Sequence, residues 1–224
     1  MSHDPHALLR LFHLVSPTLP VGAYAYSQGL EYAVHVGWID DEASALAWLE
    51  GLSGRAVGTL DLPILYRLQH AWQRGNGAAV DRWNAELLAA RETAELRAED
   101  LHLGGALARV LIELEVPGAR EWTGRATAFA TLFALAAAHW QIEPADTLRG
   151  YLWAWSDNQV LAAVKLVPLG QSAGQRLLHR LIQSMPAIVE RACRLDDEQI
   201  GVGVVSQTLA SAWHESQYSR LFRS

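Results

Sequence analysis

The most restrictive feature of this chain is its wealth of Ala and Leu, which together account for 69 of its 224 residues. Both residue types favour helices, whereas the β-branched residues Val, Ile and Thr, which favour strands, are sparse. Half of the chain is hydrophobic, and 17 Gly with 8 Pro are too few for a fibrous or a disordered protein. The composition therefore predicts an all-α globular fold.

Apolar residues at helical spacing, interrupted by Gly, Pro and capping residues, divide the chain into roughly eight to ten expected helices. These helices are expected at about residues 8–15, 23–36, 42–52, 62–74, 78–115 with a break or a close helix contact at Gly104 and Gly105, 123–141, 144–167, 173–195 and 200–212. Glycines at positions 51, 54 and 58 are expected to weaken the end of the third helix. No linker or repeat separates two halves, so residues 1–224 are expected to form a single-domain helical bundle.

Charge and targeting patterns exclude several classes of protein. The 18 Lys and Arg residues against 24 Asp and Glu give a net charge of −6, which argues against nucleic acid as a partner because phosphate binding needs a basic surface. The longest apolar stretch, residues 126–138, is shorter than the ~20 residues that span a membrane, and we expect it to be a buried core helix. The start of the chain lacks a signal-peptide pattern and Cys193 is the only cysteine, so we expect a cytoplasmic protein without disulfides.

The sequence lacks the common catalytic and metal-binding motifs. Its only lysine, Lys165, follows Val164 rather than Gly, so the chain contains no phosphate-binding P-loop. A single cysteine excludes paired-cysteine zinc sites, and neither His-Glu-x-x-His nor Gly-x-Ser-x-Gly occurs. The histidines are scattered, so each is expected to be a surface or hydrogen-bonded residue rather than a ligand. We therefore assign no catalytic residue, no metal site and no cofactor to this chain.

Three glutamates share one stripe of an expected helix. Glu92, Glu95 and Glu99 are spaced at i, i+3 and i+7, so that their carboxylates together could hold a cation. Arg91 and Arg97 lie among them. Interleaved basic residues favour a solvated, ion-paired surface or an interface over a cation site.

Residues 19–31 form an unusual segment in which a loop leads into an expected helix. If residues 23–36 are helical, Tyr24, Gln28 and Glu31 share one face, while Tyr26 and Leu30 lie on another. Only one of these faces can pack in the core. Tyr26 and Leu30 suit core packing, whereas Tyr24 with two polar companions suits an exposed recognition face.

The single lysine stands out in a chain that otherwise uses Arg 17 times. Lys165 lies near the C-terminal end of an expected helix, where the helix dipole favours a cation by ~0.3–1 kcal/mol. Arginine would serve that purpose equally well. The retained lysine therefore leaves two interpretations open: a structural cation at the helix end, or a compact ammonium group for a partner's acidic group.

The last residues, 213–224, combine apolar side chains with arginine. Tyr218, Leu221 and Phe222 are spaced at i, i+3 and i+4, with Arg220 between them, at an end that would normally fray. Tyr, Phe and Arg are the residue types that concentrate binding energy at interfaces. We therefore expect a tail that becomes ordered on binding a partner, in preference to one that packs on its own domain.

Five segments together resemble one known family, the urease accessory proteins called UreF. They are Pro20 to Tyr24, Ser27 to Glu31, Arg91 to Arg97, Lys165 to Gln171 and His214 to Ser224. Each motif alone is weak, but their order along an expected all-helical chain of this length is specific.

The resemblance implies a non-enzymatic, usually dimeric all-α scaffold that is required for assembly of the nickel centre of urease. In that family the protein binds UreD, also called UreH, and through this complex the GTPase UreG, to deliver nickel to the urease apoprotein. Nickel is then handled by the complex, and GTP and Mg by the GTPase. By motif, Tyr24 and Arg220 resemble the pair used to recruit the GTPase, Lys165 resembles part of the GTPase-facing surface, and the tail resembles the segment that orders against UreD.

Two function classes are thus carried forward. The first is a partner-binding scaffold that uses Tyr24, Gln28, Glu31, Lys165, Tyr218, Arg220, Leu221 and Phe222. The alternative is a helical-bundle enzyme or small-ligand-binding protein, which predicts histidines or carboxylates clustered inside the bundle.

Overall fold

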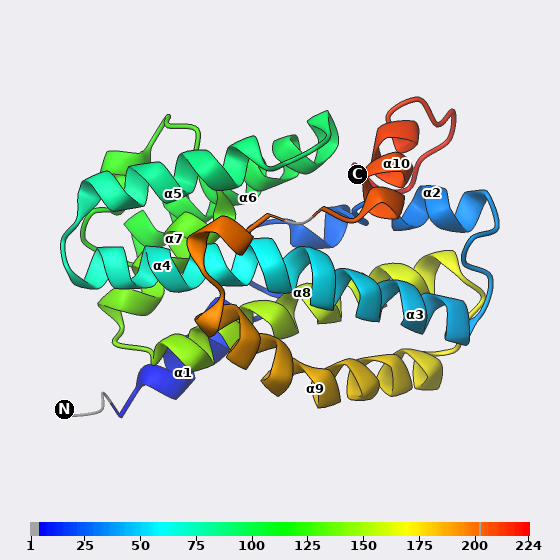
Figure 1. The fold of residues 1–224 in the computed structure, drawn as a ribbon, viewed down its shortest axis with the longest axis horizontal. Helices are drawn as coiled ribbons and strands as arrows, with labels where there is room; N and C mark the ends of the chain where they lie inside the picture. Colours follow the sequence, from blue (N-terminus) through cyan, green and yellow to red (C-terminus); the bar gives the residue numbers. More distant parts are fainter. Residues whose placement is uncertain (1–4, 202) are drawn as a thin grey trace.

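A computed structural model describes residues 5–201 and 203–224, and within these ranges the fold is entirely helical, without strands (Figure 1). The α-helices are α1 (Ala7–Leu14), α2 (Leu30–His35), α3 (Glu42–Leu52), α4 (Leu62–Gln73), α5 (Gly77–Ala89), α6 (Ala94–Glu113), α7 (Phe129–His139), α8 (Pro144–Leu166), α9 (Gln171–Arg194) and α10 (Val205–His214). The all-α prediction and the expected number of helices are confirmed. Residues 1–4, where no signal-peptide pattern was found, and residue 202 lie outside the described ranges.

The helices are arranged around α7 at one end of the molecule and around the pair α8 and α9 along its length (Figure 1). Eight of the eleven residues of α7 are buried, which confirms the expectation of a core helix. Helices α4 and α6 pack on α7, and α10 packs on α2 at the opposite end, beside the C-terminus (Figure 1). No helix within the described ranges is both long enough and apolar enough to cross a membrane.

The gap expected between the third and fourth helices is wrong, because α3 ends at Leu52 but the chain continues without a break into α4. A π-helix, η2 (Ser53–Asp61), joins the two. Pro63 lacks the N–H that would donate to the carbonyl of Thr59 in an α-helix, and the N–H of Gly201 donates to that carbonyl instead, at 3.1 Å. A Cβ added to Gly58 would lie 2.8 Å from Ile188 of α9. Gly58 therefore permits close helix packing rather than ending a helix.

The expected helix over residues 23–36 is also wrong. Only a short 3₁₀ turn, η1 (Ala23–Ala25), precedes α2, because Gln28 and Gly29 both adopt left-handed backbone conformations with φ of 54° and 85°. A Cβ added to Gly29 would lie 2.9 Å from the backbone nitrogen of Ser211 in α10. The chain therefore turns here so that α10 can approach it. Tyr24, Gln28 and Glu31 consequently do not share a helical face.

The long helix expected over residues 78–115 breaks earlier than predicted. It ends at Ala89 and restarts at Ala94, where the Thr93 hydroxyl accepts a hydrogen bond from the N–H of Leu96. At Gly104 the helix continues, but a Cβ there would lie 2.0 Å from a backbone oxygen of the segment before α7. The break at Gly104 is thus wrong, and the close contact expected as its alternative is confirmed.

The remaining boundaries differ by a few residues, as helix ends commonly do. Helices α8 and α9 match the expected ranges closely. Helix α7 begins at residue 129 rather than 123, after the 3₁₀ turn η3 (Ala119–Trp122). Helix α10 begins at residue 205, after the 3₁₀ turn η4 (Asp197–Gln199).

A buried ion cluster joins η2 to α6. Arg91 lies in the connection between α5 and α6, and its guanidinium donates to Asp61 of η2 at 2.6 Å and to Asp100 of α6 at 2.8 Å. Tyr151 donates to Asp61, and the backbone N–H of Phe129 donates to Asp100. Burial opposes the charge on Arg91, but the two carboxylates outweigh it and raise the pKa of this group.

Arg91→Ala is therefore expected to lower the free energy of unfolding by about 3–5 kcal/mol, because it leaves two buried carboxylates without their cation. Urea unfolding followed by circular dichroism measures this loss. Arg194→Ala removes an exposed i,i+4 ion pair with Glu190 and provides the matched control, for which a much smaller change is expected. Equal losses in the two variants would contradict the structural role of the buried cluster.

Candidate partner-binding site

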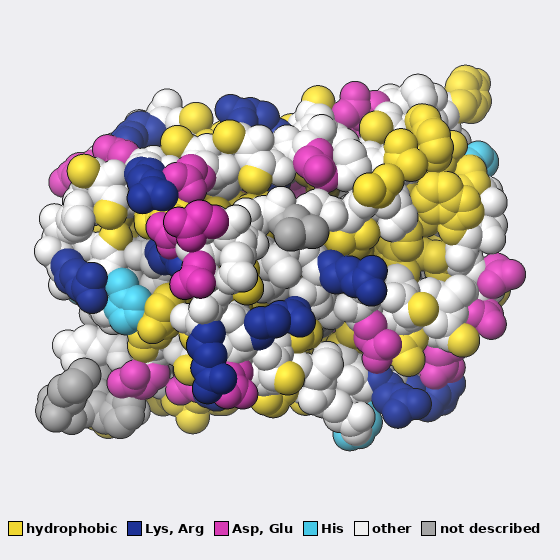
Figure 2. All heavy atoms as spheres, in the orientation of Figure 1, with side chains coloured by type: hydrophobic (Ala, Val, Ile, Leu, Met, Phe, Trp, Pro, Cys, Tyr) yellow, Lys and Arg dark blue, Asp and Glu magenta, His cyan; other side chains and the backbone are white. Residues whose placement is uncertain are grey.

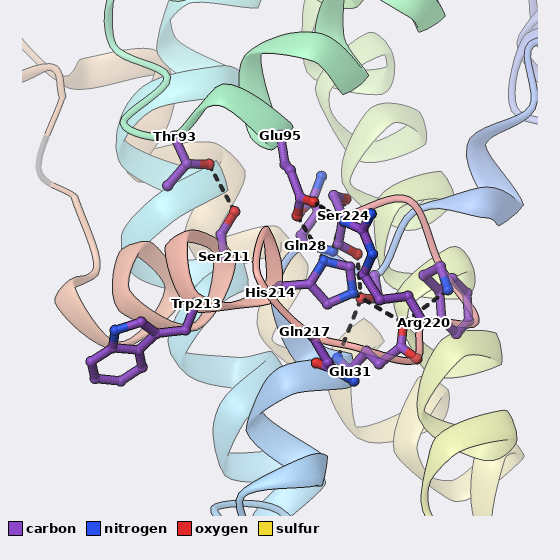
Figure 3. Close-up of polar contacts among 12 residues, drawn as sticks. Gln28, Glu31, Thr93, Glu95, Ser211, Trp213, His214, Gln217, Arg220 and Ser224 are labelled. Carbon is purple, nitrogen blue, oxygen red and sulfur yellow. Dashed lines mark hydrogen bonds and ion pairs between the residues drawn. The ribbon is translucent and has the colours of Figure 1, made fainter.

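Three segments far apart in the sequence meet at the C-terminal tail, residues 215–224. They are the loop and first turn of α2, the first two turns of α6, and the end of α10 with the tail itself (Figure 3). Figure 3 shows Glu31, Glu95, His214 and Arg220 directed toward one another from these elements. The site is therefore built by tertiary contacts rather than by one helical face.

The carboxylate of Glu31 holds the tail backbone. It is only 7% exposed and accepts hydrogen bonds from the N–H groups of Leu221 at 2.6 Å and Phe222 at 2.8 Å. Its Oε2 atom also lies 3.1 Å from Nε2 of His214. A buried carboxylate is tolerated only when its oxygens are well supplied with donors. Glu31 thus fixes the position of the tail through the backbone as well as through side chains.

The imidazole of His214 bridges two carboxylates. It is fully buried, and its Nδ1 atom lies 2.7 Å from Oε2 of Glu95. The other oxygen of Glu95 accepts a hydrogen bond from Arg220 at 2.8 Å. His214 is thus a hydrogen-bonded histidine, one of the two environments expected for the histidines of this chain.

A second anchor lies where the chain ends. The carboxylate of Glu99 is buried and accepts hydrogen bonds from Nε2 of Gln28 at 2.8 Å and from the hydroxyl of Ser224 at 3.1 Å. The amide oxygen of Gln28 accepts in turn from the indole N–H of Trp155. Burial raises the pKa of Glu99 to about 7, although both donors oppose this shift.

The favoured interpretation of the acidic stripe as a solvated, ion-paired surface is therefore wrong for two of its three members. Glu95 and Glu99 point into the domain. Of the three, only Glu92 is exposed, and its carboxylate accepts a hydrogen bond from the hydroxyl of Thr208. The interleaved arginines misled the prediction because Arg91 turns away to its own buried carboxylates.

Backbone hydrogen bonds complete the attachment of the tail. The N–H and hydroxyl of Ser27 both donate to the backbone oxygen of Ser224, and the N–H of Arg223 donates to the carbonyl of Ala25 at 2.8 Å. Inside the domain, Thr93 and Ser211 share a buried hydroxyl contact that ties α10 to α6. Ser27 and Ser224 were not among the expected site residues, although both lie in the recognised motifs.

The eight expected site residues fall into two groups. Gln28, Glu31 and Phe222 are buried or half-buried and attach the tail to the domain. The exposed group comprises Tyr24, Lys165, Tyr218, Arg220 and Leu221. The tail therefore packs on its own domain, the arrangement that the sequence analysis ranked second. That a partner also binds the tail stays a prediction.

Lys165 joins the site through the tail. Its ammonium group lies 5.6 Å from the centre of the Phe222 ring, close enough for a cation–π contact. Tyr24 is 67% exposed, and neither its hydroxyl nor its ring contacts Arg220 within the described part of the chain, since the guanidinium of Arg220 is directed to Glu95. The structure thus brings Lys165 to the tail, whereas no hydrogen bond or ring contact joins Tyr24 to Arg220 among the described residues.

An aromatic patch lies beside the tail. It consists of Tyr32, Trp38, Trp48 and Trp213, whose rings contact one another at centroid distances of 5.6–6.5 Å. Trp38 and Trp213 each expose more than two fifths of their surface. Figure 2 shows a broad hydrophobic area on this side of the molecule, where α2, α3 and α10 lie. Large exposed apolar areas are typical of protein interaction sites.

The alternative function class predicted carboxylates clustered inside the bundle. A cavity of about 190 Å³ does lie between the helices, and Asp61, Glu99 and Asp100 are among its lining residues. Arg91 neutralises two of these acids, and Gln28 and Ser224 donate to the third. No group of three or more potential metal ligands occurs within residues 5–201 and 203–224. These carboxylates are therefore committed to internal contacts.

Comparison with known proteins finds one family and relatives of nearly full length. A family model described as UreF matches residues 39–182. The chain is 47% identical over 220 residues to the urease accessory protein UreF of Hahella chejuensis, a match that covers 98% of this chain and 99% of the relative. It is 50% identical over 216 residues to the protein of that name from Alkalilimnicola ehrlichii, covering 96% and 95% of the two chains. The corresponding protein of Teredinibacter turnerae is 50% identical over 217 residues, covering 97% and 98%.

Glu99→Gln is expected to change how stability depends on pH. Because burial raises the pKa of Glu99 from its ordinary 4.5 to about 7, the folded state keeps this proton at pH values where the unfolded chain has lost it. Folding is therefore destabilised as the pH rises through this range, by about 3 kcal/mol at most. Glutamine does not titrate, so the stability of Glu99→Gln relative to the original chain should increase from about pH 4.5 to about pH 7.

Urea unfolding of both proteins across this pH range measures the difference. Glu86→Gln, at an exposed position on α5, is the matched control and should show a far smaller pH-dependent difference. A constant difference between Glu99→Gln and the original chain would contradict the raised pKa of Glu99.

Proposed function

The chain belongs to the UreF family of urease accessory proteins, and from this premise we propose that it is the scaffold that links UreD and the GTPase UreG during assembly of the nickel centre of urease. Like the family, it is a non-enzymatic protein of urease maturation. Its role is then to hold other proteins in one assembly, which couples their binding free energies rather than making or breaking bonds. The urease apoprotein receives the nickel in this scheme.

The observation that carries this proposal is the attachment of the tail, which presents exposed side chains from a fixed backbone. Tyr218 is fully exposed and Leu221 is 67% exposed, although the N–H of Leu221 is held by Glu31. A segment that is already ordered loses less entropy when a partner binds. Exposed Tyr and Leu on such a segment therefore supply apolar contact area to a partner at low cost.

We assign the recognition roles accordingly. Tyr218 and Leu221 contact UreD, while Tyr24, Arg220 and Lys165 contribute to the surface that recruits UreG. Gln28, Glu31 and Phe222 act on both partners indirectly, by positioning the tail. GTP and Mg bind to the GTPase, and nickel is a cargo of the assembly.

A homodimer is also part of the proposal. Leu8, Leu9 and Phe12 of α1 are each more than half exposed, and a second copy of the chain can bury them. Sedimentation equilibrium of the chain alone tests this, and a strictly monomeric protein at high concentration would contradict it.

The maturation role is tested best by surface variants, because removal of residues 213–224 would also remove the buried His214 and Ser224. Tyr218→Ala combined with Leu221→Ala should leave folding intact, since both side chains are exposed. In cells whose own UreF gene is deleted, the original chain is expected to restore urease activity and nickel content, and the double variant to restore less than about a tenth of it.

The matched control is Ile182→Ala, which truncates a similarly exposed apolar side chain on α9. It should restore urease as well as the original chain does. Full rescue by the double variant would remove the tail from the UreD interface. Failure of the original chain itself, with cognate UreD and UreG present, would contradict the maturation role as a whole.

Lys165→Ala is expected to give a folded protein that recruits UreG more weakly by about tenfold, because an exposed ammonium group is lost. Co-purification of UreG with the complex of this chain and UreD measures recruitment. Lys165→Arg separates the two interpretations of the lysine, since arginine preserves the charge at the helix end but not the compact ammonium. Loss of solubility in Lys165→Ala would assign the residue to structure instead.

A further inference from the structure

The hydrogen-bond geometry around His214 requires one more proton than a neutral imidazole between two ionised carboxylates supplies. Both ring nitrogens face carboxylate oxygens, Nδ1 at 2.7 Å from Glu95 and Nε2 at 3.1 Å from Glu31. Ionised carboxylates only accept hydrogen bonds, and a neutral imidazole carries a single N–H. With both carboxylates ionised, both contacts are satisfied together by an imidazolium with hydrogen on each nitrogen.

Charge balance leads to the same conclusion. Arg220 donates to the second oxygen of Glu95, so the cluster of Glu31, Glu95, His214 and Arg220 is neutral when the imidazole is protonated. It carries a net negative charge when the imidazole is neutral, in a place where His214 is fully buried and Glu31 nearly so. Burying an unbalanced charge is costly.

The other charged or titratable groups on the elements around this cluster are accounted for elsewhere. On α6 they include Glu99, which accepts from Gln28 and Ser224; Arg97, which donates to the carbonyl of Leu88; Asp100, which accepts from Arg91; and His102, which contacts the hydroxyl of Tyr26. On the other elements they include His35 on α2, which contacts Tyr32; Lys165 on α8, which lies over Phe222; and Glu215 and Arg223 of the tail, which are exposed. None of these side chains donates to or accepts from His214 among the described residues.

We propose that the C-terminal tail is a proton-dependent latch, which docks on the domain with His214 protonated between Glu31 and Glu95 and is released when that proton is lost. This goes beyond the scaffold role, because it states when the partner-binding residues of the tail are held in place. It concerns the tail and the domain alone, so its test needs no partner protein.

The carboxylate of Glu31 links the proton on His214 to the tail, because it contacts both. Without the proton, one imidazole nitrogen presents a lone pair to a carboxylate oxygen, and the two repel. If Glu31 turns away, the N–H groups of Leu221 and Phe222 lose their acceptor. Their release would withdraw Phe222 from its buried position and leave Leu221 without a fixed orientation.

The direction of the pH dependence follows from proton counting. The docked tail holds the His214 proton that the released tail loses, so raising the pH favours release; Glu99, which accepts from Ser224 and whose pKa burial raises to about 7, acts in the same direction. For one linked proton, the ratio of docked to released molecules falls by at most about tenfold for each unit of pH. The latch is thus closed on the acidic side of its transition and open on the alkaline side.

Fluorine NMR of protein labelled with fluorophenylalanine reads the latch directly, because Phe222 is buried only while the tail is docked. Substitution Phe222→Leu assigns its signal, and Phe133, which is fully buried in α7, reports whether the domain itself stays folded. As the pH is raised across the range in which the domain stays folded, the Phe222 signal is expected to move to the solvent-exposed position while the Phe133 signal stays unchanged. Nitrogen NMR of labelled histidine should show both nitrogens of His214 protonated at the acidic end.

Glu95→Gln is the decisive variant. Its amide N–H can donate to Nδ1 of a neutral imidazole while its oxygen accepts from Arg220, so the cluster needs no extra proton. The tail of this variant should stay docked to a higher pH than the tail of the original chain. His214→Ala should release the tail at both ends of the range, and His179→Ala, at an exposed position on α9, should behave like the original chain.

Three results would overturn the latch: a Phe222 signal that remains at its buried position throughout, a neutral imidazole while the tail is docked, or release of the Glu95→Gln tail at the same pH as in the original chain. The titration of the original chain and of Glu95→Gln decides the matter even if His214→Ala does not fold. Since no partner is present, failure of the latch would leave the scaffold role untouched, and loss of urease rescue would leave the latch untouched.

Discussion

The need of buried carboxylates for hydrogen-bond donors determines how this molecule is assembled. Glu31, Asp61, Glu99 and Asp100 are all buried. Arg91 supplies donors to two of them and thereby joins η2 to α6, whereas the tail supplies donors to Glu31 and Glu99 through its backbone and Ser224. The tail thus supplies the hydrogen-bond donors that the buried carboxylates of α2 and α6 need. Without Glu31 and Glu99, the last residues of the chain would lose the hydrogen bonds that hold them here.

Polar attachment gives the tail properties that apolar packing would not. Hydrogen bonds from consecutive N–H groups to one carboxylate define a single register, because a shift by one residue would exchange the buried Phe222 for an exposed neighbour. They are also sensitive to the ionisation of their partners, whereas apolar contacts are not. The two buried ion clusters therefore differ in kind: Arg91 is charged at every accessible pH, and His214 is not.

The sequence was sufficient where local patterns decide structure and insufficient where distant residues do. Helices α8 and α9 follow from apolar periodicity and from Pro and Gly at their ends. The turn at Gln28 and Gly29 could not be foreseen, because it is required by α10, some 180 residues later in the chain. The inward orientation of Glu95, which is half-buried, and of Glu99, which is buried, was missed for the same reason, since their donors lie in the tail and in the loop before α2. The motifs located the site, but its geometry depends on pairings that no local spacing encodes.

At the end of the chain, side chains that attach the tail to the domain alternate with side chains that are exposed to a partner. Leu221 and Arg223 point outward, while Phe222 and Ser224 point inward, as expected for an extended segment lying on a surface. A partner that requires the outward side chains in this fixed arrangement therefore favours the docked form. By thermodynamic reciprocity, such a partner also stabilises the contacts of Glu31 and increases the affinity of the cluster for its proton by the same factor that the proton increases partner affinity. In the proposed scheme, partner binding and proton uptake are then two aspects of a single docking equilibrium, because Arg220 and Leu221 of the tail take part in both.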